Sequence, residues 1–229
     1  MMEKTTSNAV SKVSLLSSGE LFAINKIICA QVEQITMVPL DNIAHYHRSH
    51  GALHHLMANK SARQFSESGV DEFLSLASVK LLREGMPHFS IGKSADERGI
   101  QERPEVYFRL VRPHAPSDVG IPHCDHWFHV QAGFPYSMGS TYKLWTSISS
   151  EPGLNGLCFF PNANVELLRS LFFEGSRDYR SVTQFSGDPV LPDVAPGDAL
   201  LFRDDVIHGG AVNSGSTTRC SIEVTFVPR

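Results

Sequence analysis

The chain has 229 residues, of which 41% are hydrophobic and 19% charged, and its formal net charge is −4. This length is typical of one domain with a sizeable core, and the composition is that of an ordinary globular protein. The Lys and Arg residues are dispersed, so no basic patch of the kind that binds nucleic acid is indicated. We therefore expect a single domain over residues 1–229 that does not bind nucleic acid.

Cysteine spacing and hydropathy narrow the class of protein further. Cys29, Cys124, Cys158 and Cys220 show no CxxC spacing, which argues against a zinc knuckle or a dense disulfide scaffold. No apolar run is long enough to span a bilayer, and the first residues lack a basic stretch followed by an apolar one. The sequence predicts a cytoplasmic protein with free thiols and no membrane partner.

The first part of the chain has the pattern of a helical support region. Residues 1–12 are rich in Ser, Thr and Asn and are expected to be flexible. Within residues 13–100, helical spacing begins near Ser18, where Ser17 or Ser18 with Glu20 resembles a helix cap; the apolar positions are Leu21, Ile24, Ile28 and Val32. Two more helices are expected over residues 44–66 and 70–84, the latter ended by Gly85.

Beyond residue 100, short apolar segments alternate with Gly, Pro, Asn and Asp. Strands are expected over residues 105–112, 142–148, 156–160, 199–202, 206–212 and 220–227, with a helix over residues 165–173. Many short strands at this spacing favour an antiparallel sandwich or barrel. The predicted fold class is therefore mainly β with N-terminal helices.

Two distant segments offer the ligands of a metal ion. In a strand, His123 and Asp125 would point to one face while Cys124 points away, so both could bind one metal. His208, which follows a turn at residues 196–198 and an apolar run, is the third candidate. Two imidazoles and a carboxylate are the set that holds non-haem Fe(II) and leaves positions open to oxygen and substrate. We predict that these three residues are the metal ligands and the catalytic residues.

The surroundings of His208 resemble a known family. Residues 196–210, Asn213 and then Arg219, eleven residues after His208, have the layout of Fe(II)/2-oxoglutarate dioxygenases and look most like the phytanoyl-CoA dioxygenase branch. Residues 144–145 and 155–161 resemble that family's central strands, although residues 162–164 depart from its usual pattern. The resemblance covers roughly residues 105–226 and implies a double-stranded β-helix, a cupin-like jelly-roll catalytic core, over residues 105–229.

The same resemblance implies an activity. In this family an arginine at the place of Arg219 binds the remote carboxylate of 2-oxoglutarate, a task suited to the guanidinium fork. The implied cofactors are Fe(II), 2-oxoglutarate and O2, with decarboxylation to succinate and CO2 and hydroxylation of a small-molecule metabolite. Related halogenases carry a small residue at the carboxylate position, so the retained Asp125 favours hydroxylation.

Other residues near the motif are candidates for the same site. Arg109 and Lys143 lie on expected strands and could bind cosubstrate or substrate anions, or else point to solvent. Four aromatic residues could line the substrate pocket or pack in the core: Trp127, Phe134, Tyr136 and Trp145.

Several alternatives stay open. His126 after Asp125 resembles part of the metallo-β-lactamase signature, which would need a histidine where Ile121 stands. His126 and His129 fit roles near the metal, in a lid or on the surface, and His50 and His54 have helical spacing that could bind zinc or form a partly buried helix face. The alternative functions are a cupin-like zinc hydrolase or isomerase and an inactive binding module on the same barrel. The sequence specifies neither the primary substrate nor the oligomeric state.

Overall fold

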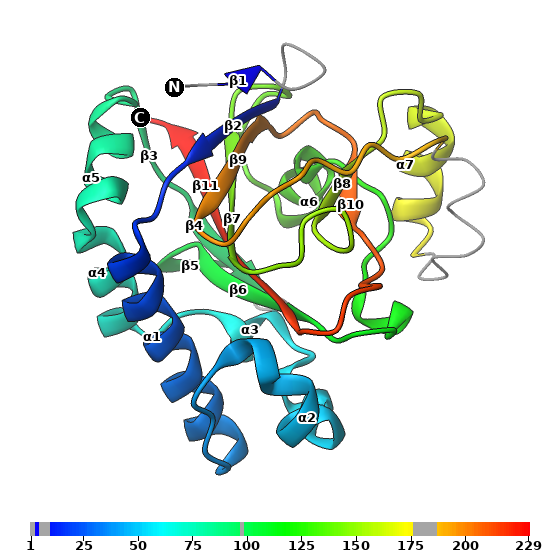
Figure 1. Cartoon of the computed structure of the whole chain (residues 1–229). Helices are drawn as coiled ribbons and strands as arrows, with labels where there is room; N and C mark the ends of the chain where they lie inside the picture. The colour runs from blue at the N-terminus through cyan, green and yellow to red at the C-terminus, as the bar shows by residue number, and fades with distance from the viewer. Residues whose placement is uncertain (1–2, 5–9, 97–98, 176–186) are drawn as a thin grey trace.

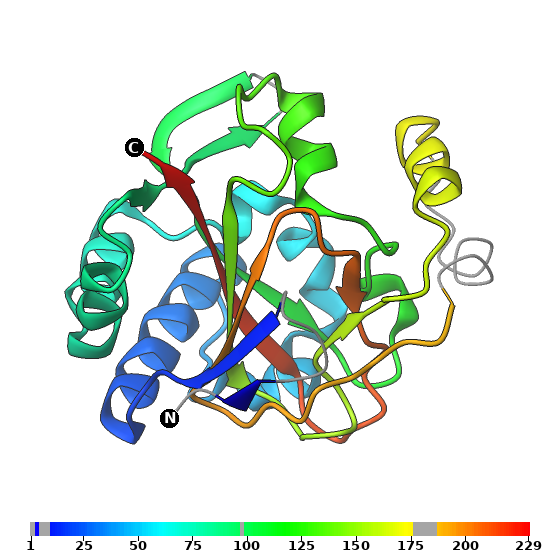
Figure 2. The same ribbon diagram turned by 90° about the horizontal axis from the view of Figure 1, so that it is seen from above.

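The structure is a computed structural model that describes residues 3–4, 10–96, 99–175 and 187–229. The N-terminal helices lie on one side of a central antiparallel sheet, and two short strands with a further helix lie on the other side (Figures 1 and 2). The described part is thus rich in antiparallel sheet and carries N-terminal helices, as predicted.

The first helix begins where the sequence predicts. In α1 (Ser18–Thr36) the Ser17 hydroxyl accepts the backbone N–H of Glu20, and the Glu20 carboxylate accepts the backbone N–H of Ser17 at 2.9 Å. This reciprocal capping box satisfies two of the N–H groups that a helix start leaves without partners. The apolar stripe of α1 is buried through Ile24, Ile28 and Val32.

The two longer helices expected next are broken into pieces. Instead of one helix over residues 44–66, the chain forms η1 (Ile43–His45), α2 (Tyr46–His50), η2 (Gly51–Met57) and α3 (Lys60–Arg63). Residues 70–84 form α4 (Glu67–Ser75) and α5 (Ala77–Glu84), separated where Leu76 is extended. Gly51 and Asn59, which are weak helix formers, stand at two of the breaks, so apolar spacing alone overestimates helix length here.

The central sheet contains strands from both ends of the chain. Among the described residues the order is β1-β2-β9-β7-β11-β3, and β6 also pairs with β11. The bounds are β1 (Glu3–Lys4), β2 (Val10–Ser14), β3 (Phe89–Ile91), β6 (Val106–Val111), β7 (Tyr142–Ser149), β9 (Asp198–Arg203) and β11 (Arg219–Pro228). Part of the segment expected to be flexible, residues 10–12, therefore lies in a paired strand, while residues 1–2 and 5–9 lie outside the described part.

Smaller elements complete the fold. Two further antiparallel pairs join β4 (Lys93–Asp96) to β5 (Gly99–Pro104) and β8 (Leu157–Phe159) to β10 (His208–Gly210), and three more helices are η3 (Pro116–Asp118), α6 (Asp125–Ala132) and α7 (Val165–Phe173). The strand predicted over residues 206–212 is thus shorter, and strands already begin inside the expected helical region of residues 13–100. Within the described ranges the strands do not close into a barrel.

The two faces of the sheet have different chemistry. Alternate residues of β6, β7 and β11, among them Phe108, Leu144 and Ile222, pack with α1 in the largest apolar cluster. The residues between them point to the opposite face, because side chains alternate along a strand. On that face lie Tyr107, Arg109, Lys143, Trp145, Arg219 and Glu223.

A second apolar cluster supports the segment that carries the predicted metal ligands. Trp127 of α6 and Cys124 pack with residues of α7 and of the β8 and β10 region, including Phe160, Leu168 and Phe172. This cluster holds α6 beside the polar face of the sheet.

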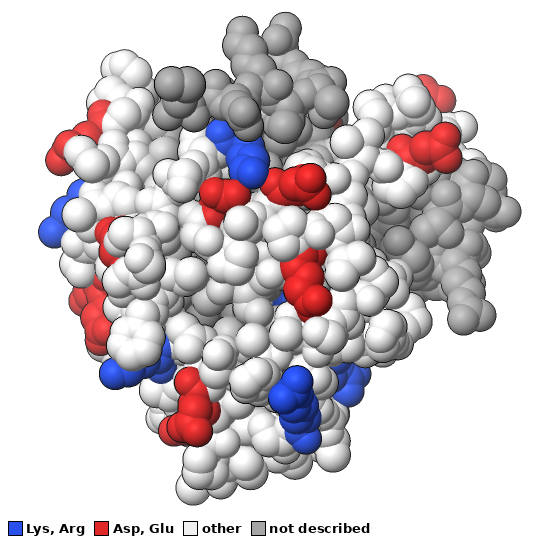
Figure 3. All heavy atoms as spheres, in the orientation of Figure 1, with Lys and Arg blue, Asp and Glu red and all other residues white. Residues whose placement is uncertain are grey.

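The outer surface shows no single-sign patch in the view of Figure 3, where acidic and basic side chains are interspersed. In the described ranges no helix combines the length and the apolar character needed to cross a bilayer.

Candidate active site

The predicted metal ligands meet on the polar face of the sheet. One ligand atom each from His123, Asp125 and His208 lies within 4.8 Å of the others. The two histidines are joined through their backbones: the His123 N–H donates to the His208 carbonyl at 2.9 Å, and the His208 N–H donates to the His123 carbonyl at 2.8 Å. This bridge between distant segments places the two imidazole rings 4.7 Å apart.

Both imidazoles are oriented by a hydrogen bond to a backbone carbonyl two residues earlier in the chain. Nδ1 of His123 lies 2.7 Å from the carbonyl of Ile121, and Nδ1 of His208 lies 2.9 Å from the carbonyl of Val206. A carbonyl can only accept, so each Nδ1 carries the proton and each Nε2 keeps a lone pair for a metal. Burial, with the neighbouring His208, lowers the pKa of His123 to about 4. His123 is therefore neutral at neutral pH, as metal binding requires.

The third candidate ligand, Asp125, reaches the two histidines in a different way from the one predicted. Residues 123–125 do not form a strand, because Cys124 is extended (φ −113°, ψ 148°) and Asp125 is the first residue of α6. The turn from extended chain into helix brings Asp125 Oδ1 to 3.9 Å from His208 Nε2. The Cys124 side chain is buried in the apolar cluster around Trp127. The two ligands therefore converge through a helix start rather than through strand alternation.

The carboxylate of Asp125 is ionised and incompletely paired. Its Oδ2 atom is buried and accepts no hydrogen bond from the described residues, while Lys143 Nζ lies 3.6 Å away. Burial by itself would raise the pKa of Asp125, but Lys143 and the nearby histidines together outweigh it, and the pKa is lowered. Two imidazoles and one anionic oxygen without a hydrogen bond are the donor set that suits a divalent iron ion.

A cavity of about 710 Å³ opens beside His123 and Asp125. Its wall includes Lys60, Arg63, Glu105, Tyr107, Arg109, Phe128, His129, Phe134 and Lys143. Acidic and basic groups are paired there: Lys60 with Glu105, and Arg109 Nε with Glu223 Oε1 at 3.2 Å. Tyr107 also donates its hydroxyl proton to Glu223. The wall therefore combines paired charges with the apolar rings of Phe128 and Phe134.

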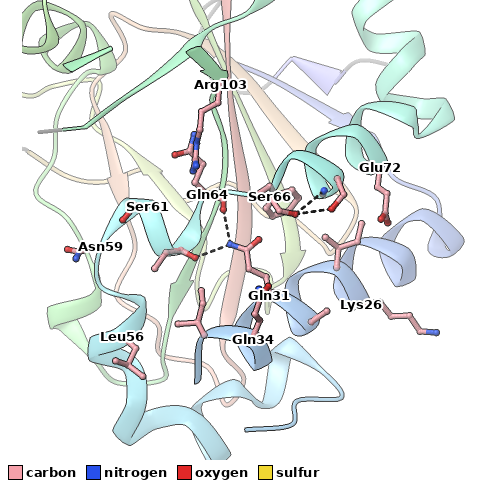
Figure 4. A pocket seen from close by; sticks show the side chains of 17 residues that line it. Lys26, Gln31, Gln34, Leu56, Asn59, Ser61, Gln64, Ser66, Glu72 and Arg103 are labelled. Carbon is pink, nitrogen blue, oxygen red and sulfur yellow. Dashed lines mark hydrogen bonds between the residues drawn. The ribbon is translucent and has the colours of Figure 1, made fainter. Parts of the chain in front are cut away.

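A larger hollow lies elsewhere, between α1, α3 and α4, with a volume of about 880 Å³ (Figure 4). The Gln31 amide on its wall donates to the carbonyls of Ala62 and Gln64 at 2.9 and 2.8 Å, and the Ser66 hydroxyl caps α4. These groups serve the fold, and none of His123, Asp125 and His208 lines this hollow. The cavity beside the histidines is therefore the better candidate.

Arg219 is a buried cation without a carboxylate partner among the described residues. Its side chain has no exposed surface, and Nη1 donates to the carbonyl of Gly156, while Nε and Nη2 have no hydrogen-bond partner in the described part. A Cβ atom on Gly210 would lie 3.2 Å from Nη1, so the absence of a side chain at this position leaves space for the guanidinium. Burial, with Arg109 adding to it, lowers the pKa of Arg219 to about 10, which leaves it charged at neutral pH. A buried, partly unpaired guanidinium fits an anionic ligand such as a carboxylate.

The structure separates the other candidate residues. Arg109, Lys143 and Phe134 line the cavity, and Tyr136 stacks on Phe134 with 5.3 Å between ring centroids. Trp127, however, is two residues after Asp125 on α6, so its side chain points about 200° around the helix axis from that of Asp125. It is buried against Phe172.

Trp145 also departs from the expected pocket role. It points to the polar face of the sheet but is covered there by Leu157, Leu200 and Phe202. The expectation that the two tryptophans line the pocket is corrected by this packing, and both are core residues. His50 and His54 form no common site either, because His50 Nε2 lies 3.1 Å from the Val38 carbonyl and His54 Nε2 lies 3.3 Å from Asp118.

Sequence reasoning missed several residues that line the cavity or pair with residues that line it. Glu223 is an acid between the apolar residues Ile222 and Val224, a signal that could have identified an inward-facing charge. Tyr107 shares a face with Arg109 on the expected strand. Lys60 and Arg63 come from a short helix far away in the chain, and spacing alone gives no indication of them.

Comparison with known proteins gives structural relatives only. No family model and no curated protein matches the sequence. Among solved structures, HygX from Streptomyces hygroscopicus, determined with nickel and 2-oxoglutarate bound, is 15% identical, with a TM-score of 0.57 over 96% of this chain and 83% of HygX.

Two further relatives have similar scores. The 2-oxoglutarate-dependent carbocyclase SnoK from nogalamycin biosynthesis is 14% identical, with a TM-score of 0.53 over 96% of this chain and 80% of SnoK. An N-substituted L-amino acid dioxygenase from Burkholderia ambifaria AMMD is 13% identical, with a TM-score of 0.51 over 95% of this chain and 82% of that one. The chain therefore has the fold of the non-haem, 2-oxoglutarate-dependent oxygenases.

Proposed function

We propose that this chain is an Fe(II)- and 2-oxoglutarate-dependent oxygenase that hydroxylates a small-molecule metabolite. The observation that carries the proposal is the donor set at the cavity: two imidazoles with free Nε2 atoms and a buried carboxylate oxygen without a hydrogen bond. The shared fold supports it, and we propose further that the sheets correspond to the jelly-roll core of these enzymes.

Different residues of the site would bind the metal ion and the oxo acid. His123 and His208 would hold Fe(II) through Nε2 and Asp125 through its carboxylate, while Arg219 would hold the remote carboxylate of 2-oxoglutarate. When bound, this pair supplies the oxidising chemistry with O2, in which the oxo acid becomes succinate and CO2. The positive charges of Lys143 and Arg109 lie on the same wall and favour anionic ligands there.

The neighbouring side chains keep the ligands in the right state. Lys143, which also donates to Thr225 Oγ1 at 2.8 Å, holds its charge beside Asp125 and keeps that carboxylate deprotonated. The ring of Phe128 packs edge-on against His123 with 4.9 Å between centroids. This contact shields the imidazole from water and fixes its tilt.

The cavity wall also suggests the substrate class. Arg63 Nε is buried and has no hydrogen-bond partner in the described part, although the side chain lines the cavity. A small metabolite with an anionic group would satisfy this atom, since a buried cationic N–H without an acceptor is costly. The retained carboxylate ligand Asp125 favours hydroxylation as the outcome.

The decisive experiment is anaerobic reconstitution with Fe(II) and 2-oxoglutarate. We expect a visible metal-to-ligand absorption band, its loss in His123→Ala, and its retention in His88→Gln, which changes an exposed histidine. Addition of O2 should then yield succinate, with faster formation in the presence of anionic candidate substrates. Absence of the band, or turnover with zinc that does not require O2, would overturn the proposal in favour of a hydrolase or isomerase.

A further inference from the structure

A second group of potential metal ligands lies next to the first one in the chain. One ligand atom each of His126, His129 and Asp204 lies within 4.8 Å of the others, and none of these residues belongs to the first site. In the described part of the chain, His126 Nδ1, His129 Nδ1 and Asp204 Oδ2 are buried and have no hydrogen-bond partner. We propose that this second group binds one zinc-like divalent ion in a largely buried site, through two imidazoles and one carboxylate.

The fold brings these three side chains together from two segments. His126 and His129 are three residues apart on α6, so they lie on one face of that helix. Asp204 follows β9, and its carbonyl accepts the backbone N–H of His126 at 3.0 Å. The other oxygen of the carboxylate, Oδ1, accepts the backbone N–H of Gly139 at 2.7 Å. The carboxylate is therefore fixed with its free oxygen toward the two imidazoles.

The distances suit a metal ion better than direct hydrogen bonds. Asp204 Oδ2 lies 3.5 Å from His129 Nδ1 and 3.7 Å from His126 Nδ1. Bonds of about 2.0–2.1 Å from zinc to nitrogen or oxygen place the ligands of a tetrahedral ion about 3.3–3.4 Å apart. Small rotations of the side chains would let one ion contact all three atoms, with a water as the fourth ligand.

The burial of the group calls for a positive charge. The Asp204 side chain is 1% exposed and the His129 side chain 8% exposed. Among the described residues Asp204 has no Lys or Arg ion-pair partner. A buried carboxylate is unfavourable unless a cation compensates it. A divalent ion would supply that charge and satisfy all three atoms at once.

The two sites differ in their access to solvent. The first site faces the cavity, whereas the second reaches it only through His129, which is covered by the rings of Phe134 and Tyr136 at 5.8 and 5.4 Å. A site with an open face suits iron with an oxo acid, and a largely buried site with nitrogen and oxygen ligands suits zinc. The wall position of His129 provides a path for the ion to enter.

The test counts metal in the full chain after removal of metals with a chelator. Titration with Zn²⁺, and with Co²⁺ as a spectroscopic probe, should give two equivalents in the parent chain and one in the double variant His123→Ala/His208→Ala. Further replacement by His126→Gln and His129→Gln should abolish the remaining equivalent. The control His88→Gln in the double variant should retain it, because His88 is exposed and distant in sequence.

A second measurement does not require the His126→Gln and His129→Gln variants, and so it remains valid if they fail to fold. The sample is the double variant His123→Ala/His208→Ala, in which His126 and His129 are left intact. X-ray absorption at its zinc edge should show a four-coordinate ion with two imidazole ligands. No zinc bound to the double variant, or zinc unaffected by His126→Gln and His129→Gln, would overturn the proposal. Neither measurement uses 2-oxoglutarate, so the result does not depend on the proposed activity.

Discussion

At the scale of single residues, the site is a set of buried charges in which each has a limited number of partners. Lys143 faces Asp125, Arg109 faces Glu223, and Arg219 faces only a backbone carbonyl through one of its nitrogens. Because removal of one partner from a buried pair leaves the other charge uncompensated, substitutions here have specific and separable effects.

Arg219→Met should weaken binding of 2-oxoglutarate by about 10- to 100-fold, because hydrogen bonds to charged groups contribute about 1.5–3 kcal/mol. The measurement is an anaerobic titration of the Fe(II) form, followed by the absorption band. Arg203→Met, which removes an exposed arginine paired with Asp205, is the matched control and should leave the affinity unchanged. Equal affinity in Arg219→Met would show that this residue does not bind the cosubstrate.

Lys143→Met should make metal binding weaker and more dependent on pH. Lys143 lowers the pKa of Asp125, so its loss raises that pKa and protons then compete with the metal as the pH falls. We expect a larger loss of Co²⁺ affinity at pH 6 than at pH 8. Lys93→Met, which removes a lysine paired with Glu102 on the surface, should show the same affinity as the parent chain at both values.

At the scale of elements, α6 shows where sequence reasoning succeeds and where it fails. Residue type and spacing were enough to predict the candidate ligands His123, Asp125 and His208, but the strand assigned to residues 123–125 does not form. No side chain caps α6, and its start depends on the burial of Trp127 with Phe172, a contact between distant segments. Local patterns carry no information about such a contact.

In the other elements too, local features were predictable and contacts between distant segments were not. The capped start of α1 was predictable, because Ser17 and Glu20 act on their own turn. The breaks near Gly51 and Leu76 were not, because apolar spacing continues across them. Lys60 and Arg63 reach the cavity from α3 only through tertiary packing, which explains their absence from the predicted site.

The cap of α1 provides a test at this scale. Ser17→Ala removes the acceptor for the Glu20 N–H and should lower the free energy of unfolding by about 1 kcal/mol. The exposed serine Ser61 lies on a short helix, and Ser61→Ala should change stability by less than about 0.5 kcal/mol. Urea unfolding, monitored by circular dichroism, gives the free energy of unfolding of Ser17→Ala and Ser61→Ala. Equal values for the two variants would show that the Ser17 cap does not stabilise α1.

At the scale of the whole molecule, two buried acidic residues, Glu105 on the cavity wall and Glu223 beside it, couple stability to pH. Burial alone would raise the pKa values of Glu105 and Glu223, but nearby cations and hydrogen bonds together lower both to about 2. The cations are Lys143 and Lys60 for Glu105, and Arg109 and Lys143 for Glu223. A carboxyl group with a lowered pKa in the folded state stabilises the fold above its unfolded pKa, and this contribution is lost as the pH falls.

We therefore expect the free energy of unfolding of the metal-free protein to decrease as the pH falls from about 5 toward 2. Urea unfolding at a series of pH values measures this slope. Glu223→Gln removes one of the two groups and should give a shallower slope, whereas Glu72→Gln, on the exposed side of α4, should keep the slope of the parent chain. An unchanged slope in Glu223→Gln would show that its ion pair does not control the acid limit.

The alternation along β11 has one more consequence. Its even-numbered residues Cys220, Ile222 and Val224 belong to the apolar core, and its odd-numbered residues include Arg219 and Glu223 of the site. A slip of one residue in pairing would exchange the two sets and drive both charges into the helix-facing core. Such a misfolded form is too costly to accumulate, so refolding should yield either native protein or unfolded chain.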